Sequence, residues 1–304
     1  MTPREIIAQA WAITTKEKML RRWGFLSSLF ETLRNVEIIL YQTYFLYWYF
    51  KGTSVGWLSV EILFYESMPF WLFLAVTIIL LVLLVFELFL PTLATGAIIG
   101  LAAKSYRKEE VKGGLVLALY NFFPILEVHG FFLLSSFTAV FTVWSLMLRY
   151  SGGDSSIKQG ATILILIIWF LAMIFRFFAS FAEEGIVIRK SGAFTAIGRS
   201  FKLIISYLSH VMFLVLLLLV ITLRIVINTI MVLLLPALAI GLGLFLTTFL
   251  SAALSYTIAT VLALGLVVLV SYFLAYLHVF KQTVWTLTYL ELSAQKDLDV
   301  IEGG

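Results

Sequence analysis

The sequence predicts an all-α integral membrane protein whose chain crosses the bilayer about six times. Of its 304 residues, 62% are apolar and only 12% are charged, whereas soluble chains are close to half apolar and a quarter charged. The apolar residues also gather in long runs, and residues 71–90 alone can cross a hydrocarbon core of roughly 30 Å. Because a chain in lipid must satisfy its own backbone hydrogen bonds, we expect these runs to be helices.

The predicted spans share a mostly apolar run with polar residues near its ends. They cover residues 23–50, 69–103, 129–149, 159–182, 211–235 and 257–280. The first is the least apolar because it contains Glu31, Arg34 and Glu37. A further apolar stretch, 236–256, is long enough for a seventh span.

Lys and Arg near the span ends predict the orientation, because cytoplasmic loops carry an excess of these residues. Most of the basic residues fall on one predicted side, and only Lys51, Arg149 and Lys158 fall on the other. We therefore expect both termini in the cytoplasm. A seventh span would place Lys281 outside, so we expect 236–256 to be a re-entrant or interfacial segment.

Charge and cysteine content exclude several classes of function. The formal net charge is +4 at pH 7, but the basic residues lie at span ends, so orientation in the membrane explains them and no nucleic-acid partner is expected. Cysteine is absent, which excludes a disulfide framework, a thiolate metal site and a Cys nucleophile. No phosphate loop, nucleotide fingerprint or zinc spacing is present, so we expect no cofactor and no metal.

The chain is predicted to be a single membrane domain, 1–304, in which one unit occurs three times. The copies cover residues 1–103, 104–182 and 183–292, and a short polar tail follows at 293–304. Each copy would consist of a cytoplasmic-side amphipathic helix and two spans. Internal repeats of this kind occur in transporters, although duplication in a scaffold gives the same pattern.

The three cytoplasmic-side helices differ in their sequence signals. In the third copy, apolar residues recur at steps of three and four, which is typical of a helix lying in the interface plane. These residues are Phe194, Ile197, Phe201, Ile204 and Leu208. The first copy opens with Thr2 and Glu5 in a capping-box pattern. The middle copy, 111–128, is more apolar, and we expect Pro124 to break it.

Residues 183–213 carry a resemblance to a known family. The segment reads Glu183-Glu184-Gly185-Ile186-Val187-Ile188 and then Ala196-Ile197-Gly198-Arg199-Ser200-Phe201-Lys202-Leu203 before a span. It resembles a bacterial membrane-domain family related to the membrane part of glycerophosphoryl diester phosphodiesterases. The resemblance implies a bacterial cytoplasmic membrane protein. It implies no catalytic residue, because the phosphodiesterase activity of such fusions resides in a separate soluble domain.

Ionisable residues inside spans are the candidate site, because each costs about 2.5–3.5 kcal/mol to insert. Glu31, Arg34 and Glu37 are spaced three apart, and we expect them to neutralise one another along one helix face rather than to line a cavity. Glu87 and Arg224 are expected to form an interhelical pair, with a proton- or substrate-coupled site as the alternative. Asn228 follows Arg224 by one turn and would extend the same polar face.

Other polar and small residues have simpler interpretations. Arg176 lies near a cytoplasmic span end, to which its side chain can extend. The histidines (His129, His210 and His278) are expected at membrane interfaces, and only His129 has a close polar neighbour in sequence, Glu127. Gly96 and Gly100 form a small-xxx-small step that predicts close helix packing.

The favoured function is therefore a membrane scaffold or accessory subunit without its own catalytic site. It would act through a membrane-protein partner or self-association within the bilayer, and it would contact membrane lipids. The alternative is a small-molecule or lipid transporter that uses the intramembrane Glu and Arg residues. A membrane-embedded enzyme is the least favoured class, since only His129 and Glu127 indicate acid–base chemistry.

Overall fold

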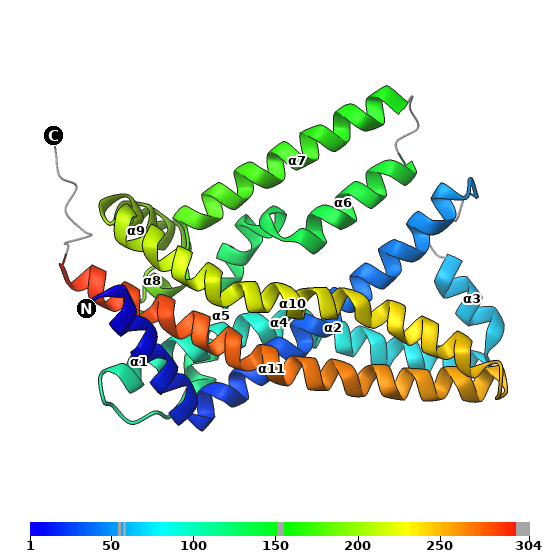
Figure 1. Cartoon of the computed structure of the whole chain (residues 1–304), viewed down its shortest axis with the longest axis horizontal. Coiled ribbons are helices and arrows are strands. Elements are labelled where there is room, and N and C mark those ends of the chain that lie inside the picture. Colours follow the sequence, from blue (N-terminus) through cyan, green and yellow to red (C-terminus); the bar gives the residue numbers. More distant parts are fainter. Residues whose placement is uncertain (54–55, 57–58, 151–154, 296–304) are drawn as a thin grey trace.

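The computed structural model describes residues 1–53, 56, 59–150 and 155–295, without the side chains of 220–233, 235, 236 and 239. Over this part of the chain every regular element is a helix (Figure 1). In order, the elements are α1 (Pro3–Lys16), α2 (Lys18–Phe50), α3 (Ser59–Ser67), α4 (Phe70–Tyr106), α5 (Gly114–Phe131), the 3₁₀ turn η1 (Leu133–Ser135), α6 (Phe137–Tyr150), α7 (Ser155–Phe178), α8 (Ala182–Arg189), α9 (Ala193–Ser206), α10 (Leu208–Leu246) and α11 (Ala252–Gln295).

Four helices among the described residues are long and apolar enough to cross a membrane. They are Phe70–Tyr106, Gly114–Phe131, Ser155–Arg189 and Ala252–Gln295. The pair Ala193–Ser206 and Leu208–Leu219, bent by 94°, makes a fifth if it counts as one span. This is the composition of a multi-pass membrane protein.

The longest helices exceed the thickness of a bilayer. Helices α4, α10 and α11 have 37, 39 and 44 residues. At a rise of about 1.5 Å per residue they are roughly 55–65 Å long, about twice the hydrocarbon thickness. Part of each helix therefore lies outside the hydrocarbon core when the rest crosses it.

Burial divides the molecule into two ends, which we call the packed end and the splayed end. The packed end consists of α1, α5, α8, α9, the first half of α2 and the second halves of α4 and α11. The splayed end consists of α3, α6, the first part of α7, the second half of α2 and the first halves of α4 and α11, while the end of α7, with Arg176, reaches the packed end. In Figure 1 the α6–α7 pair diverges from the α10–α11 pair toward this end, and no residue of α7 is buried.

Helix α1 is fixed at both its cap and its terminus. Thr2 and Glu5 form the predicted capping box, with the Glu5 amide donating to Thr2 Oγ1 and the Thr2 amide donating to Glu5 Oε2. The Met1 ammonium donates to Glu291 Oε2 at 2.9 Å, and Tyr106 donates to the other oxygen of that carboxylate. The hydrogen bond and the charge of Glu291 raise the pKa of the Met1 ammonium above its ordinary value of 8.0.

Glycines permit the closest helix contacts of the packed end. A Cβ on Gly24 of α2 would lie 2.1 Å from Val279 Cγ2 of α11. A Cβ on Gly100 of α4 would lie 2.7 Å from Leu117 Cδ1 of α5, and one on Gly96 would also be tightly placed. The close packing predicted at Gly96 and Gly100 is confirmed.

Several predicted boundaries are wrong. Helix α5 runs without a break through Pro124, because Pro removes one backbone donor while the rest of the turn keeps its bonds. The predicted span 129–149 is divided among the end of α5, η1 and the 14-residue α6. The stretch 236–256 is divided between the end of α10 and the start of α11, which form a helical hairpin, and its re-entrant or interfacial position stays a prediction.

Candidate functional site

Ionisable side chains gather in two clusters between the helices. The first, which we call the carboxyl pair, consists of Glu37 on α2 and Glu87 on α4. The second, which we call the α8 cluster, is centred on Glu183 and Glu184 at the start of α8. Both clusters lie in helices whose remaining residues are largely apolar.

The carboxyl pair brings two acids together at the border between the two ends. Glu87 is fully buried and is the first buried residue along α4. The Glu37 carboxyl, which is exposed on its outer side, lies within hydrogen-bonding reach of the Glu87 carboxyl. No donor among the described residues reaches either Glu87 oxygen. Two carboxylates cannot hydrogen-bond to each other, so this contact requires one proton between them.

Arg34 does not neutralise either acid. Its Nη1 donates to the backbone carbonyl of Glu87 at 3.3 Å. Among the described residues no ion pair joins Arg34 to Glu31 or Glu37, so the expected self-neutralised cluster on α2 does not form. The reason is geometric, since the guanidinium extends across to α4 instead of along its own helix.

Two predicted site residues fall outside what the structure describes. Arg224 and Asn228 belong to α10, in the stretch whose side chains are left out. The Glu87–Arg224 pair therefore stays a prediction.

The α8 cluster joins three helices through Glu183. The Glu183 carboxylate accepts a hydrogen bond from Arg176 Nη2 and lies 3.2 Å from His129 Nε2. His129 Nδ1 lies 3.2 Å from the Thr92 hydroxyl of α4. This geometry fits the tautomer in which Thr92 donates to Nδ1 and the Nε2 hydrogen points at Glu183. The Arg176 guanidinium also lies over the Phe132 ring, 5.5 Å from its centroid.

These contacts bear on two predictions. Arg176 forms an ion pair that the sequence did not predict, with Glu183, whose side chain is only 9% exposed. His129 pairs with Glu183 rather than with its sequence neighbour Glu127, which is exposed. A buried carboxylate is costly to leave unpaired, so the two partners converge on it from α5 and α7.

Glu184 extends the cluster to α11. It is fully buried and accepts a hydrogen bond from Gln282 Nε2 at 2.9 Å, while its Oε2 has no partner among the described residues. One turn earlier on α11, His278 Nε2 lies 3.4 Å from the Ser27 hydroxyl of α2. His278 therefore contacts α2, and its predicted position at a membrane interface stays a prediction.

The face of α2 connects the two clusters. Ser27, Glu31 and Arg34 are spaced by four and three residues and so share one face of the helix. Glu31 is close enough to His278 and Lys281 of α11 for their charges to interact, and Glu183 interacts with the same two groups. We call this series of groups the polar path. Its members are Glu37, Glu87, Arg34, Glu31, His278, Lys281, Glu183, His129 and Arg176.

The polar path is a set of titratable and hydrogen-bonding groups, and the described residues hold no group of three or more side chains fit to ligate a metal. Comparison with family models, with curated proteins and with solved structures gave no match. The chemistry of the site is therefore argued from its own geometry. Proton transfer and binding of a polar group are what such carboxyl and imidazole groups do.

Proposed function

We propose that this protein is a multi-pass membrane protein that couples a proton to the movement of a small molecule or a lipid, with the polar path as its site. The observation that carries the proposal is the fully buried Glu87 carboxyl, which faces the Glu37 carboxyl and meets no donor among the described residues. A purely structural buried acid is normally paired and hydrogen-bonded. An acid that faces another acid is a place where a proton binds and leaves.

The carboxyl pair also provides a physical basis for coupling. With one proton between them, Glu37 and Glu87 attract, and α2 and α4 are held together. Without it, two negative charges repel in a medium of low dielectric. Loading and unloading the proton therefore changes the energy of the α2–α4 contact, at the border where the packed end opens into the splayed end. A ligand that neutralises the pair would compete with the proton.

The proposal includes a topology of six spans with both termini in the cytoplasm of a bacterium. The first and third copies support it, since α1 is followed by the longer α2 and α4, and α9 by the longer α10 and α11. The middle copy departs from this order, because α6 has 14 residues and the preceding α5 has 18. The threefold repeat expected from the sequence is part of this proposal. The resemblance to the phosphodiesterase-associated membrane domains stays a prediction and adds no residue to the site.

The test is proton movement in reconstituted vesicles. Purified protein is placed in phosphatidylcholine–phosphatidylglycerol vesicles that contain a pH-sensitive dye, with the small-molecule fraction of a cell lysate on both sides and an imposed membrane potential. We expect wild type to move protons faster than empty vesicles, and Glu87→Gln and Glu37→Gln to return to the empty-vesicle rate. Glu66→Gln, at an exposed site on α3, is the matched control and should behave as wild type. Equal rates in wild type and Glu87→Gln would overturn the proposal.

The second candidate is a scaffold or accessory subunit that acts through lateral partners. The specific observation in its favour is α7, none of whose residues is buried and most of whose apolar side chains are exposed. Lipid alone can cover such a helix, so this observation ranks below the carboxyl pair. A stoichiometric protein companion in native mass spectrometry of the protein with its surrounding lipid would place this candidate first.

A further inference from the structure

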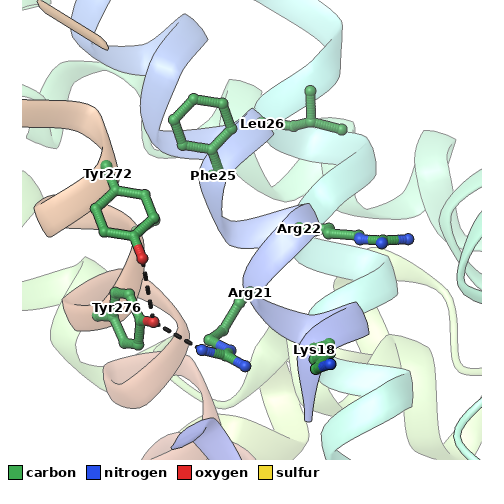
Figure 2. Close-up of a pocket in the computed structure, with 8 residues that line it drawn as sticks. Lys18, Arg21, Arg22, Phe25, Leu26, Tyr272 and Tyr276 are labelled. Carbon is green, nitrogen blue, oxygen red and sulfur yellow. Dashed lines mark hydrogen bonds between the residues drawn. The ribbon is translucent and has the colours of Figure 1, made fainter. Parts of the chain in front are cut away.

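A cavity of about 590 Å³ opens between the start of α2 and the middle of α11. Lys18, Arg21 and Arg22 of α2 and Tyr272 and Tyr276 of α11 line it. Figure 2 shows Arg21 directed at Tyr276, while Arg22 extends from the other side of α2. None of the polar path residues lines this cavity. It is therefore a second, separate site.

Arg21 is held in place at the centre of the cavity. Its Nη1 donates to the Tyr276 hydroxyl at 2.7 Å, and the Tyr276 and Tyr272 hydroxyls are 3.5 Å apart. The guanidinium carbon lies 5.5 Å from the centroid of the Tyr276 ring. The buried Arg21 Nε has no partner among the described residues. The guanidinium is thus oriented by tyrosine while keeping donors free for another group.

The cavity is strongly cationic and holds no countercharge of its own. Three of its lining residues are basic and none is acidic. All three lie in the first five residues of α2, whose N-cap residue, Glu17, makes no side-chain cap hydrogen bond and instead accepts one from the Ser105 hydroxyl. Cations at a helix N-terminus are unfavourable because they meet the positive end of the helix dipole. A bound anion would offset both the dipole and the clustered charges.

The remaining walls are apolar. Phe25, Leu26 and Ala275 line the cavity beside the cations. Continuing along α11, Phe273 and Leu269 are more than half exposed, on a helix apolar enough to span the membrane. Tyrosines at this boundary are typical of the membrane interface. The site therefore joins a phosphate-sized cationic region to a surface that suits an acyl chain.

We propose that this cavity binds the phosphate group of an anionic glycerophospholipid from the leaflet at the packed end. Arg21 and Arg22 contact the phosphate oxygens, because the planar guanidinium matches their geometry and binds them with two parallel hydrogen bonds. Lys18 adds a third charge, and the acyl chains follow Phe25, Leu26 and the exposed face of α11. Free phosphate shares the headgroup chemistry but would leave the apolar walls uncovered.

Native mass spectrometry of detergent-purified protein tests this site. Wild type is titrated separately with phosphatidylglycerol, phosphatidylcholine and inorganic phosphate. We expect phosphatidylglycerol to be retained at least about tenfold more tightly than the other two. Removal of two charge-assisted contacts in Arg21→Gln/Arg22→Gln should weaken its retention by about tenfold or more. The matched control is Arg107→Gln/Lys108→Gln, which removes the same charge from exposed positions after α4.

Each other outcome overturns the proposal. Equal retention of phosphatidylglycerol and phosphatidylcholine would show that the site does not discriminate between lipids by the charge of their headgroups. Tight binding of inorganic phosphate alone would assign the site to a soluble anion. Equal loss in the control variant would mean that overall charge, not this cavity, holds the lipid. If the double variant does not fold, Arg22→Gln replaces it, because Arg22 lies exposed at the surface. This variant should still weaken phosphatidylglycerol retention several-fold, and unchanged retention would overturn the assignment.

Discussion

The packed end and the splayed end of this protein share the same helices but differ in what surrounds them. Along α4, residues 70–86 contain no buried side chain, whereas Ala94–Ala103 are buried without exception. Helix α11 shows the same change in the reverse direction along the chain, with mostly exposed residues at its start and most of its buried residues between Val279 and Leu292. One end is therefore held by protein contacts, while the apolar surface of the other is left for lipid or a partner.

This difference explains where polar chemistry is placed. The α8 cluster lies within the packed end, where helices converge from several directions and can pair a buried acid. The carboxyl pair lies at the border, where Glu87 begins the buried part of α4 and Glu37 is still exposed on α2. The ion pairs of the α8 cluster are therefore enclosed by packed helices, whereas the protonatable carboxyl pair lies where that packing ends. Only the second lies where helices have room to separate.

The largest effect is expected from breaking the α8 cluster. Arg176→Gln leaves Glu183 with His129 alone, and removing one partner of a buried ion pair lowers the free energy of unfolding by about 3–5 kcal/mol. Arg149→Gln is the matched change at the splayed end, where Arg149 bonds Gln42 and lies over the Phe45 ring; we expect about 1 kcal/mol or less. Denaturant unfolding in micelles, followed by tryptophan fluorescence, measures both. Equal losses would remove the distinction between the ends.

A double substitution that removes the charges of Arg176 and Glu183 together isolates the energy of their pairing. Arg176→Gln combined with Glu183→Gln should be less destabilising than the sum of the single changes, because neither charge is then left alone. Strict additivity would contradict the direct pairing of these residues.

A large-to-small substitution compares the apolar packing of the two ends. Ile99→Ala removes a fully buried side chain of α4, and we expect a loss of about 2–5 kcal/mol. Ile167→Ala on α7 removes a side chain that is 51% exposed, and its effect should stay within about 0.5 kcal/mol. The same unfolding measurement applies. A large loss for Ile167→Ala would show that α7 is covered by protein after all, through a partner or a second copy.

Two glycine substitutions compare how closely α11 is packed at the packed end and at the splayed end. Gly24→Val forces a side chain into the space of Val279, and overpacking of this kind lowers stability by about 1–3 kcal/mol. Gly265→Val lies on α11 at the splayed end, where an added Cβ meets nothing within 4 Å. We expect no loss there. Thermal unfolding monitored by circular dichroism distinguishes the two, and an equal loss would argue against close contact between α2 and α11.

The smallest effect is expected at the chain terminus. The raised pKa of the Met1 ammonium means that its contact with Glu291 stabilises the packed end fully below pH 8.0, and that this contribution is lost as the pH rises through the higher folded-state value. Thermal stability should therefore fall slightly on the alkaline side. Glu291→Gln should remove that part of the dependence. An unchanged alkaline profile in the variant would show that the contact contributes nothing measurable.

Much of the helical framework follows from sequence, because long apolar runs in lipid have one conformation available. The Thr2–Glu5 cap and the Gly96–Gly100 packing could also be predicted, since each depends on local spacing. Pro124 could not be placed correctly, because packing of α5 against α4 holds the helix through a residue that would break it in isolation.

The α8 cluster lay beyond sequence reasoning for a different reason. His129, Arg176 and Glu183 come from three helices, and their pairing depends on how those helices cross. The available signal was the occurrence of Glu183 and Glu184 next to an apolar run, where an uncompensated acid is costly. In the sequence, Glu183 and Glu184 are also part of the segment that resembles the phosphodiesterase-associated membrane domains, and that resemblance assigns them only a structural role. The carboxyl pair was half predicted, since Glu37 and Glu87 were both singled out but assigned to different partners.

Infrared difference spectroscopy of the protein in lipid tests the shared proton of the carboxyl pair most directly. At neutral pH we predict the C=O band of a protonated carboxylic acid in wild type. The band should disappear in Glu87→Gln, because the exposed Glu37 ionises once its like-charged neighbour is gone. In Glu37→Gln it should shift in frequency but remain, because the buried Glu87 keeps its proton, and it should be unchanged in Glu66→Gln. The spectra are recorded in a Glu184→Gln background, because the Glu184 carboxyl is also fully buried with one unpartnered oxygen. Absence of the band before the pair is changed, or its survival in Glu87→Gln, would contradict the account.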